Sequence, residues 1–424
     1  MKSGKYREIG SHKTYRGEES IHDYTMKEPS PFTPGNPVPL ELFVGREPQI
    51  EEIFRYIQRS AKGKQENIFL IGDRGIGKSS LGGYIRQLAV VRENVLAIHI
   101  HLGMVQGIND VVIKIFDSLL KETYKETYFG RIKDFFGKYI KEVGLFGVSV
   151  AFSPPKDIGD SLKLNFAEAL MNTLEKLKDE KTGLLLILDD INGLTKTDEF
   201  ANWYKSLVDH VATHHKDCPI TIILIGLPEN RDALAEHQES LMRIFRIIHV
   251  EKLSDTEVNL FFKKAFDSVH ISIDDDAMRV MLRYSSGLPL LMHEIGDSIY
   301  WKNSDDRIEL HDAVLGIEAA TNIIGEKYIS PKISRSIRSQ RYKSILSKIG
   351  EKWAYRFDKS QIEKDLNVEE RKVFNNFLRT MREKGIIIQD IDGKLGSYKF
   401  VNEMYFLYIA ISSSERAAKA GVKK

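Results

Sequence analysis

The segment Gly72 to Ser79 constrains the fold of this chain more than any other. It follows an apolar run, Asn67 to Ile71, and precedes a stretch with helical periodicity, Ser80 to Ala89. Its pattern, a glycine, four residues and then Gly-Lys-Ser, is typical of a loop whose backbone N–H groups surround phosphates at the start of a helix. The sequence therefore predicts a strand, a phosphate-binding loop and a helix in that order.

Each residue type in this loop has a chemical reason. Glycines allow the backbone to curl tightly around an anion. Lys78 is expected to reach the β- and γ-phosphates of a nucleotide, and the hydroxyl of Ser79 to coordinate Mg²⁺. The sequence thus predicts ATP and Mg²⁺ as cofactors. The loop residues expected at the nucleotide are Gly72, Asp73, Arg74, Gly75, Ile76, Gly77, Lys78, Ser79 and Ser80.

Other apolar runs predict a parallel sheet covered by helices. From Leu42 onward, short runs rich in Ile, Leu and Val alternate with helix-period stretches, as in α/β proteins. A mostly helical insertion, residues 103–182, separates the second and third runs. Its apolar segment 144–152 is interpreted as extra core or as a partner-binding hairpin. The predicted strands are 67–71, 95–102, 183–189, 220–226 and 247–250.

Two carboxylates, Asp189 and Asp190, end the third predicted strand. They follow the apolar residues Leu184 to Leu188, about a hundred residues after the phosphate loop and with one strand between. In this position Asp189 is expected to hold Mg²⁺ through water, and Asp190 to orient the attacking water. Together with Lys78 they are the predicted catalytic residues, and Ser79 and Asp189 are the predicted metal residues.

These motifs resemble those of the AAA+ and STAND ATPases, in particular initiator-like and archaeal-type members with a winged helix after the lid. Residues 43–47, Phe-Val-Gly-Arg-Glu, look like the family's first box, whose backbone lines the adenine pocket. Residues 240–246 look like the segment that offers an arginine finger to a neighbouring subunit, and 287–289 like the GxP motif near the base. The resemblance covers about residues 40–412. It implies an ATPase that forms homo-oligomers, with Val44, Gly45 and Pro289 at the nucleotide and Arg243 as a catalytic finger acting in trans.

The chain also departs from this family. Many members have Asp-Glu where this chain has Asp189-Asp190, and the shorter carboxylate favours slow turnover or a switch. The fourth predicted strand ends in Ile-Gly-Leu-Pro at 225–228 and offers no clear polar sensor, so Asn230 is the candidate. No arginine occurs in 287–295 to act as a second sensor.

Composition and turn residues divide the chain into four parts. Residues 1–30 are expected to be a flexible tail, and prolines at 31, 34, 37 and 39 to hold an extended segment after it. Ser254 and Glu257 form a predicted capping box at the start of a helical region. The predicted domains are a P-loop ATPase core at 31–252, a helical lid at 253–330 and a basic winged-helix domain at 331–424.

The C-terminal domain is predicted to bind duplex DNA. Residues 331–424 hold 21 Lys and Arg against 11 Asp and Glu, a charge of +10, whereas the rest carries −8 of the total of +2. Two predicted helices, 358–366 and 369–384, and a hairpin around Asp392-Gly393 resemble a winged helix. A solvated positive surface and a winged helix that packs against protein are the alternatives. The predicted DNA contacts are Arg371, Asn375, Arg379, Arg382, Lys394 and Lys399.

The histidines and the single cysteine are interpreted as structural. His210, His214, His215 and nearby Cys218 have spacing compatible with zinc, but they end a predicted helix and no second ligand cluster follows. His99 and His101 are expected to be packed on one strand face. One cysteine excludes an internal disulfide, and neither a signal peptide nor a membrane span is apparent, so a cytoplasmic protein is expected.

Two classes of function remain open from the sequence. The first is a nucleotide-controlled switch that couples slow ATP hydrolysis to oligomerisation and DNA binding, with a possible protein effector. The second is an interaction scaffold or defence-type signalling protein, in which nucleotide is structural and the winged helix packs against protein. A small-molecule kinase fits less well because no acceptor-binding motif follows the phosphate loop.

Overall fold

The centre of the protein is a five-stranded parallel sheet. The computed structural model describes residues 27–421 except 106, 125, 127–128, 131–139, 144–148, 153–162, 164 and 216. The strands follow the order β2-β5-β6-β1-β7, and every residue of β1, β5 and β6 is buried. All five predicted strands are confirmed, with ends that differ by at most two residues. They are β1 (Glu66–Ile71), β2 (Leu96–His101), β5 (Leu184–Asp189), β6 (Ile220–Gly226) and β7 (Phe245–His249).

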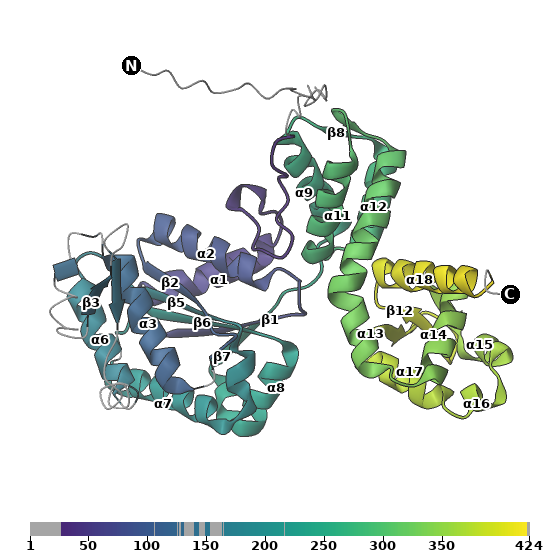
Figure 1. Ribbon diagram of the computed structural model, residues 1–424. Helices are drawn as coiled ribbons and strands as arrows, with labels where there is room; N and C mark the ends of the chain where they lie inside the picture. Colours follow the sequence, from purple (N-terminus) through teal and green to yellow (C-terminus); the bar gives the residue numbers. More distant parts are fainter. Residues whose placement is uncertain are drawn as a thin grey trace, which may run out of the picture.

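Helices cover both faces of this sheet, and each face has its own apolar core (Figure 1). The first face packs against α1 (Glu47–Ser60) and α2 (Lys78–Glu93). The other packs against α3 (Ile108–Thr123), α6 (Phe166–Leu177) and α7 (Asp198–His214). Such double cover explains why the central strands read as continuous apolar runs rather than as alternating ones. The elements that complete this domain are η1 (Leu40–Leu42), η3 (Ile191–Lys196), α8 (Pro228–His237) and η4 (Glu239–Arg243).

The apolar insertion segment forms part of a small hairpin. Strand β3 (Ile140–Val143) pairs antiparallel with β4 (Ser149–Phe152), which lies beside α3. The rest of the segment predicted as core or hairpin, residues 144–148, lies outside the described residues. The hairpin backbone is therefore established, and its role stays a prediction.

The predicted helical lid consists of four helices: α9 (Asp255–Asp267), α10 (Asp275–Ser285), α11 (Pro289–Lys302) and α12 (Leu310–Ile324). Two short parallel strands, β8 (Ser272–Ile273) and β9 (Arg307–Ile308), join them. The predicted capping box is confirmed, because the Ser254 hydroxyl accepts from the Glu257 N–H at 3.3 Å and a Glu257 carboxylate oxygen accepts from the Ser254 N–H at 2.7 Å. The helical region after the sheet therefore begins at the predicted capping box, and the division of the chain into domains stays a prediction.

The proline-containing segment before the sheet is anchored on the lid. Phe32 is buried in the lid core, with its ring centroid 4.9 Å from that of Phe266. The Lys27 ammonium donates to the carbonyl oxygen of Asn303 at 2.8 Å. The predicted core domain at 31–252 thus includes residues that pack with the lid. We call residues 27–39 the strap; of the predicted tail, residues 1–26 lie outside the described residues.

The C-terminal unit has the element order helix, strand, three helices, two strands and helix. Its antiparallel sheet has the order β10-β12-β11, and this arrangement is compatible with the predicted winged helix. A π-helical turn, η5 (Gly325–Ile329), and α13 (Ser330–Ser336) lead into it. The elements are α14 (Gln340–Glu351), β10 (Arg356–Asp358), α15 (Lys359–Asp365), α16 (Val368–Arg371), α17 (Phe374–Glu383), β11 (Ile387–Gln389), β12 (Ser397–Phe400) and α18 (Glu403–Gly421).

The helix predicted over 369–384 is two helices, separated by a turn at 372–373. Helix α16 is held on α14, because the buried Glu370 carboxylate accepts from the Ser344 hydroxyl at 2.7 Å and from the Lys348 ammonium at 2.6 Å. Helix α17 instead turns Phe374 and Phe377 into the core of its own unit. The turn at 372–373 therefore allows α16 to pack against α14 while α17 packs into the core of the C-terminal unit.

The C-terminal unit lies against the lid (Figure 1). Helix α18 packs beside α10 and α12, and Arg283 of α10 pairs with Glu403 of α18 at 3.2 Å. At the π-helical turn, a Cβ on Gly325 would overlap the ring of Tyr408. The lid helices therefore contact the C-terminal unit directly. Within the described part of the chain, no helix is both long and apolar enough to cross a membrane.

Candidate functional site

The phosphate loop lies between β1 and α2 as predicted, and its lysine closes it. Lys78 is the first residue of α2, and its ammonium donates to the carbonyl oxygens of Gly72 at 2.7 Å and Asp73 at 2.8 Å. Gly75 and Gly77 have φ of 75° and 94°, a region that side chains disfavour. Burial lowers the pKa of Lys78, although Asp189 and Asp73 oppose the shift. The ammonium therefore lies inside the loop, beside carboxylates whose charge it partly offsets.

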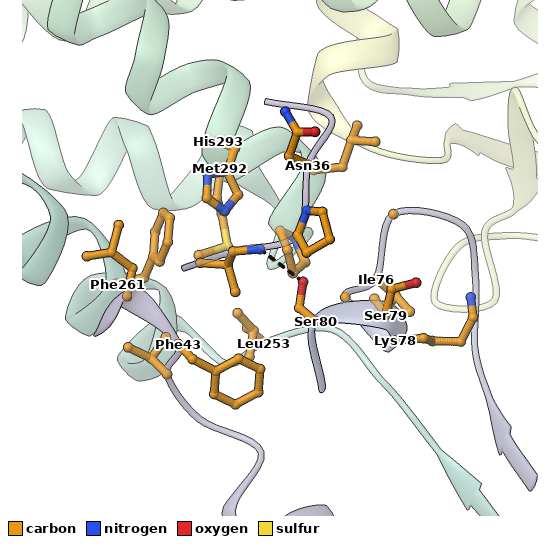
Figure 2. Close-up of a pocket in the computed structure, with 18 of the residues that line it drawn as sticks. Asn36, Phe43, Ile76, Lys78, Ser79, Ser80, Leu253, Phe261, Met292 and His293 are labelled. Atoms are coloured by element: carbon orange, nitrogen blue, oxygen red, sulfur yellow. Dashed lines mark hydrogen bonds between the residues drawn. The ribbon is translucent and has the colours of Figure 1, made fainter. Parts of the chain in front are cut away.

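A cavity of about 390 Å³ opens on one side of this loop. We call it the base cavity. Its walls come from the strap at 35–38, from a segment around the first box, from the loop at 75–80 with His101, and from the lid. The first-box segment contributes Leu42, Phe43, Val44 and Arg46, and the lid contributes Leu253, Phe261, Pro289, Leu290, Met292 and His293. Figure 2 shows Phe261, Met292 and His293 of the lid at one end and Lys78 and Ser79 at the other. The extent of the cavity between these two ends and its apolar lining suit a nucleobase and a sugar.

A second cavity of about 560 Å³ lies at the carboxyl ends of β2, β5 and β6. We call it the phosphate cavity. Gly75, Lys78, Ser79 and His101 line both cavities, so one ligand can extend from the first into the second. Predicted site residues that line at least one of them are Val44, Arg74, Gly75, Ile76, Gly77, Lys78, Ser79, Ser80, Asp189, Asp190 and Pro289.

Asp189, the predicted metal carboxylate, is buried and held by its neighbours. His99 Nε2 lies 3.0 Å and His101 Nδ1 lies 3.3 Å from its Oδ2 atom. Burial opposes ionisation of this carboxyl, but hydrogen bonds from His99 and Ser79 outweigh it, so the pKa of Asp189 is lowered. The structure thus brings the predicted metal pair Ser79 and Asp189 together. It also places both histidines beside this carboxylate, a contact that the expectation of packed histidines did not include.

The second carboxylate, Asp190, lies in the left-handed backbone region with φ 59° and ψ 57°. Its Oδ1 atom accepts from the Asn192 amide. On the other side the carboxylate lies so close to Gly103 that a Cβ there would overlap it. Strained backbone that is fixed by contacts on both sides is common where a side chain must be aimed. Here it directs Asp190 at the phosphate cavity.

The predicted first box joins the phosphate loop to the lid. Arg46 is buried; its guanidinium donates to the carbonyl oxygen of Ile76 at 3.0 Å and to that of Glu251. Its backbone N–H donates to Glu257 Oε1 at 3.0 Å. Gly45 has φ of 70°, and a Cβ there would overlap the Glu257 carboxylate. Gly45 therefore serves backbone geometry, whereas Val44 lines the base cavity.

Residues 287–289 bring the lid onto the phosphate loop. Gly287 has φ of 69°, and its carbonyl oxygen accepts from the Leu253 N–H at 2.9 Å. Three residues after Gly287, the Leu290 N–H donates to the carbonyl oxygen of Gly75 at 3.2 Å. Pro289 starts α11 and faces Gly77. The start of α11 is therefore hydrogen-bonded directly to the phosphate loop.

The strap supplies site residues that sequence reasoning missed. The Val38 N–H donates to the Ser80 hydroxyl at 3.2 Å, a bond drawn as a dashed line in Figure 2. The Thr33 N–H donates to His293 Nδ1 at 3.1 Å. Strap, loop and lid thus enclose the base cavity together. The proline spacing predicted an extended segment, but nothing local in the sequence indicates where such a segment docks.

The buried His293 makes folding sensitive to acid. It is 5% exposed, and burial lowers its pKa from 6.5 to about 4. The unfolded chain therefore takes up this proton at higher pH than the folded one, so stability is lost as pH falls from 6.5 to about 4. The wild type should lose free energy of unfolding between pH 6.5 and 4. We expect His293→Asn, which keeps a hydrogen-bond acceptor, to lose about 3 kcal/mol less than the wild type over this pH range.

Urea denaturation at pH 7, 5.5 and 4 measures this difference. His237→Asn, at an exposed histidine on α8, is the control and should follow the wild type. Parallel pH profiles for the wild type and His293→Asn would show that the buried imidazole does not govern the acid response.

Other candidates from the sequence occupy different positions. Arg243 is exposed at the end of η4 and lines neither cavity of its own chain. Asn230, the candidate sensor, is buried with its side chain engaged: Oδ1 accepts from the Leu227 N–H at 2.7 Å and Nδ2 donates to Thr195 Oγ1 at 2.9 Å. Asn230 therefore caps α8. Among the described residues of this loop, no other residue takes its place as the sensor candidate.

The predicted DNA residues are all in the C-terminal unit, but their surroundings differ. Arg371 is on α16, where its Nε donates to the carbonyl oxygen of Glu363 at 3.0 Å. Lys399 is 3.1 Å from Asp390 Oδ1 and is half-buried, which leaves it little freedom to meet a phosphate. Asn375, Arg379, Arg382 and Lys394 are exposed, as is Arg371, and Arg379 also lies 3.9 Å from Glu383.

The histidines on α7 gather around a carboxylate from α6. His210 Nε2 lies 2.8 Å and His215 Nε2 lies 3.3 Å from Glu168 Oε1. These three groups are exposed or half-buried, and they lie on the surface away from the phosphate loop. Cys218 is buried, and burial raises the pKa of its thiol to about 12. Cys218 is therefore interpreted as an unreactive residue of the core.

Comparisons with known proteins agree with this geometry. Residues 42–215 match the AAA ATPase domain family. The Walker-type ATPase of Pyrococcus abyssi is similar over 87% of this chain and 96% of its own, with 16% identity and a TM-score of 0.53. The ORC2 protein of Aeropyrum pernix, in ADPNP–ADP complexes, is similar over 88% and 95%, with 10% identity and a TM-score of 0.54. At these identities the structures show a shared fold. A search of curated proteins found no match.

Proposed function

Residues 42–215 form an AAA ATPase domain, and from this premise we propose that the protein is a molecular switch driven by ATP. It binds ATP with Mg²⁺ in the two joined cavities, hydrolyses it slowly to ADP and phosphate, and couples the nucleotide state to DNA binding. The observation that carries the proposal is the hydrogen bond from the Leu290 N–H of the lid to the carbonyl oxygen of Gly75 in the phosphate loop.

The residues around the phosphate cavity have the chemistry that hydrolysis requires. Lys78 exchanges its two carbonyl partners for phosphate oxygens when nucleotide enters. Ser79 and the ionised Asp189 are the groups that would hold Mg²⁺, which neutralises charge on the phosphates. Asp190 orients the attacking water from its fixed backbone position. Because an aspartate reaches less far than a glutamate, this water is less well positioned and turnover is slow.

The lid carries the nucleotide signal to the C-terminal unit. Helix α11 begins at Pro289 on the phosphate loop and packs along α12, which continues through the π-helical turn into α13. The pair Arg283 and Glu403 attaches the C-terminal unit to the same lid. A rotation of α11 on the γ-phosphate therefore moves the C-terminal unit as a body.

Arg243 completes the site of a neighbouring copy in this proposal. Its guanidinium is exposed, and no described carboxylate of its own chain forms an ion pair with it. A free arginine before β7, away from both cavities of its own chain, suits a contact made between subunits. The protein would then hydrolyse ATP as a homo-oligomer.

Duplex DNA is the proposed ligand of α17. We expect Arg379→Ala together with Arg382→Ala to weaken DNA binding and to reduce the slope of log K against log salt by about 2, one unit for each lost phosphate contact. Fluorescence anisotropy with a duplex at several salt concentrations measures both quantities.

The control is Lys352→Ala with Lys372→Ala, which removes the same charge from the same unit. Lys352 pairs with Asp365 at 2.6 Å and Lys372 with Glu369 at 2.5 Å, closer than the 3.9 Å between Arg379 and Glu383, so both control charges are already partnered. Equal losses in both double variants would indicate a diffuse charge effect and would remove α17 as the DNA-binding face.

One observation favours a second function, a scaffold whose C-terminal unit docks on protein. The turn between β11 and β12 is acidic at Asp390 and Asp392, and these carboxylates hold Lys399 at 3.1 and 3.7 Å. Arg356 also pairs with Asp390, at 2.9 Å. A hairpin neutralised in this way is poorly suited to enter a DNA groove. Absence of salt-dependent DNA binding would favour this second function.

A further inference from the structure

Three metal-binding side chains converge at the edge of the sheet. Strand β2 pairs in parallel with β5, and the register places His101 opposite Asp189 and His99 opposite Ile187. Because side chains two residues apart share a strand face, both imidazoles lie on the side of the Asp189 carboxylate. The ligand atoms of the three residues all lie within 4.8 Å of one another.

The spacing of these atoms matches a transition-metal site. His99 Nε2 and His101 Nδ1 lie 3.0 and 3.3 Å from Asp189 Oδ2. Ligands at zinc distances of roughly 2.0 to 2.1 Å in a tetrahedron are separated by about 3.3 Å. Imidazole nitrogen with one carboxylate suits zinc, cobalt and related ions, whereas Mg²⁺ prefers oxygen. The set therefore differs in chemistry from a pure oxygen site.

One side of the site is buried, and the other side is open to the phosphate cavity. The side chains of Asp189 and His99 are 3% and 11% exposed, whereas that of His101 is 63% exposed and lines the phosphate cavity. The His99 ring fits against α2 because residue 82 is glycine; a Cβ there would lie 3.1 Å from His99 Cε1. An ion could enter from the cavity and keep a free coordination position facing it.

We propose that His99, His101 and Asp189 bind a divalent transition-metal ion of the zinc class in the nucleotide-free protein. The ion replaces the contacts that His99 Nε2 and His101 Nδ1 now make with Asp189 Oδ2, and it is held by these two nitrogens and this oxygen. The inference goes beyond the proposed function, since it needs no nucleotide. It also sets a competition, because the same carboxylate is needed when Mg²⁺ and ATP bind.

The test uses Co²⁺, whose visible absorption reports the coordination geometry, added to the full chain without a histidine tag and without nucleotide. His210→Ala with His215→Ala serves as the parent, because this removes the surface histidines beside Glu168. We expect one Co²⁺ per chain with the intense bands of a tetrahedral site. His99→Gln and His101→Gln, which keep a hydrogen-bond donor for Asp189, should each weaken binding by about 10-fold or more.

Zinc titration by calorimetry on the same proteins gives a second readout, and circular dichroism verifies that each variant is folded. Lys78→Ala, which removes the phosphate contact, should still bind Co²⁺, so loss of nucleotide binding and loss of the metal site are distinguishable. No Co²⁺ bound by the parent, or undiminished binding by folded His99→Gln and His101→Gln, would overturn the proposal and leave the histidines as hydrogen-bond partners of Asp189.

Discussion

Lys78→Ala should bind ATP with Mg²⁺ about 100-fold more weakly than the wild type, a loss of about 3 kcal/mol. The ammonium belongs to the first residue of α2, and it lies near Asp73, Asp189 and Asp190. Its removal takes away two charge-assisted contacts to phosphate oxygens and leaves these carboxylates to repel the nucleotide. Equilibrium binding of a fluorescent ATP analogue measures the change.

Lys114→Ala is the matched control for this prediction. Lys114 is exposed on α3 and lines the phosphate cavity, but it lies outside the loop. Removal of its charge should weaken binding less than about threefold, as expected for a solvent-screened cation. If both variants lost affinity equally, the loop lysine would have no special role and the general charge of the cavity would hold the nucleotide.

Gly287→Ala should detach the lid from the phosphate loop. The residue has φ of 69°, and a Cβ there would overlap the carbonyl oxygen of Leu253, which is backbone and has no room to move. Strain in the left-handed region with this overlap should cost at least about 2 kcal/mol of the free energy of unfolding. We also expect weaker ATP binding, because the bond from Leu290 to Gly75 is lost. Urea denaturation and the same nucleotide titration measure both effects.

Gly385→Ala is the control that separates the effect of steric overlap from the effect of backbone strain. This glycine has φ of 62°, and a Cβ there would meet nothing within 4 Å. The substitution should cost about 1 kcal/mol from the backbone alone and leave ATP binding unchanged. A Gly287→Ala protein that matched it in stability and in nucleotide affinity would show that the contact with Leu253 does not hold the lid in place.

Much of the sheet could be predicted from the sequence because its signals are local. The five strands are mostly apolar runs, and the phosphate loop has a fixed pattern from Gly72 to Ser79. The capping box at Ser254 is likewise local, since its two hydrogen bonds join residues three apart. Patterns of this kind do not depend on the rest of the fold.

The remaining features depend on distant contacts. The strap reaches His293 from Thr33, and Leu290 reaches Gly75; no spacing in the sequence specifies these pairs. The histidines on β2 meet Asp189 only because β2 and β5 are neighbours in the sheet. That strand order was not available from the sequence, so His99 and His101 were interpreted as packed residues.

The C-terminal unit shows the same division. Its hairpin and its final helix follow local patterns, and the turn at 372–373 does not. Glu370 is drawn to Ser344 and Lys348 of α14, a contact that the amphipathic pattern of 369–384 does not contain. Lys399 counted as a free positive charge in the sequence, but Asp390 and Asp392 lie beside it once the hairpin forms.

The central claim is that nucleotide turnover and DNA binding are coupled through the lid. Phosphate release by the purified protein with ATP and Mg²⁺, with and without duplex DNA, tests it most directly, with Lys78→Ala as the blank. The account predicts slow release that DNA stimulates and that Lys78→Ala abolishes. Tight ATP binding without turnover and without any response to DNA would contradict it.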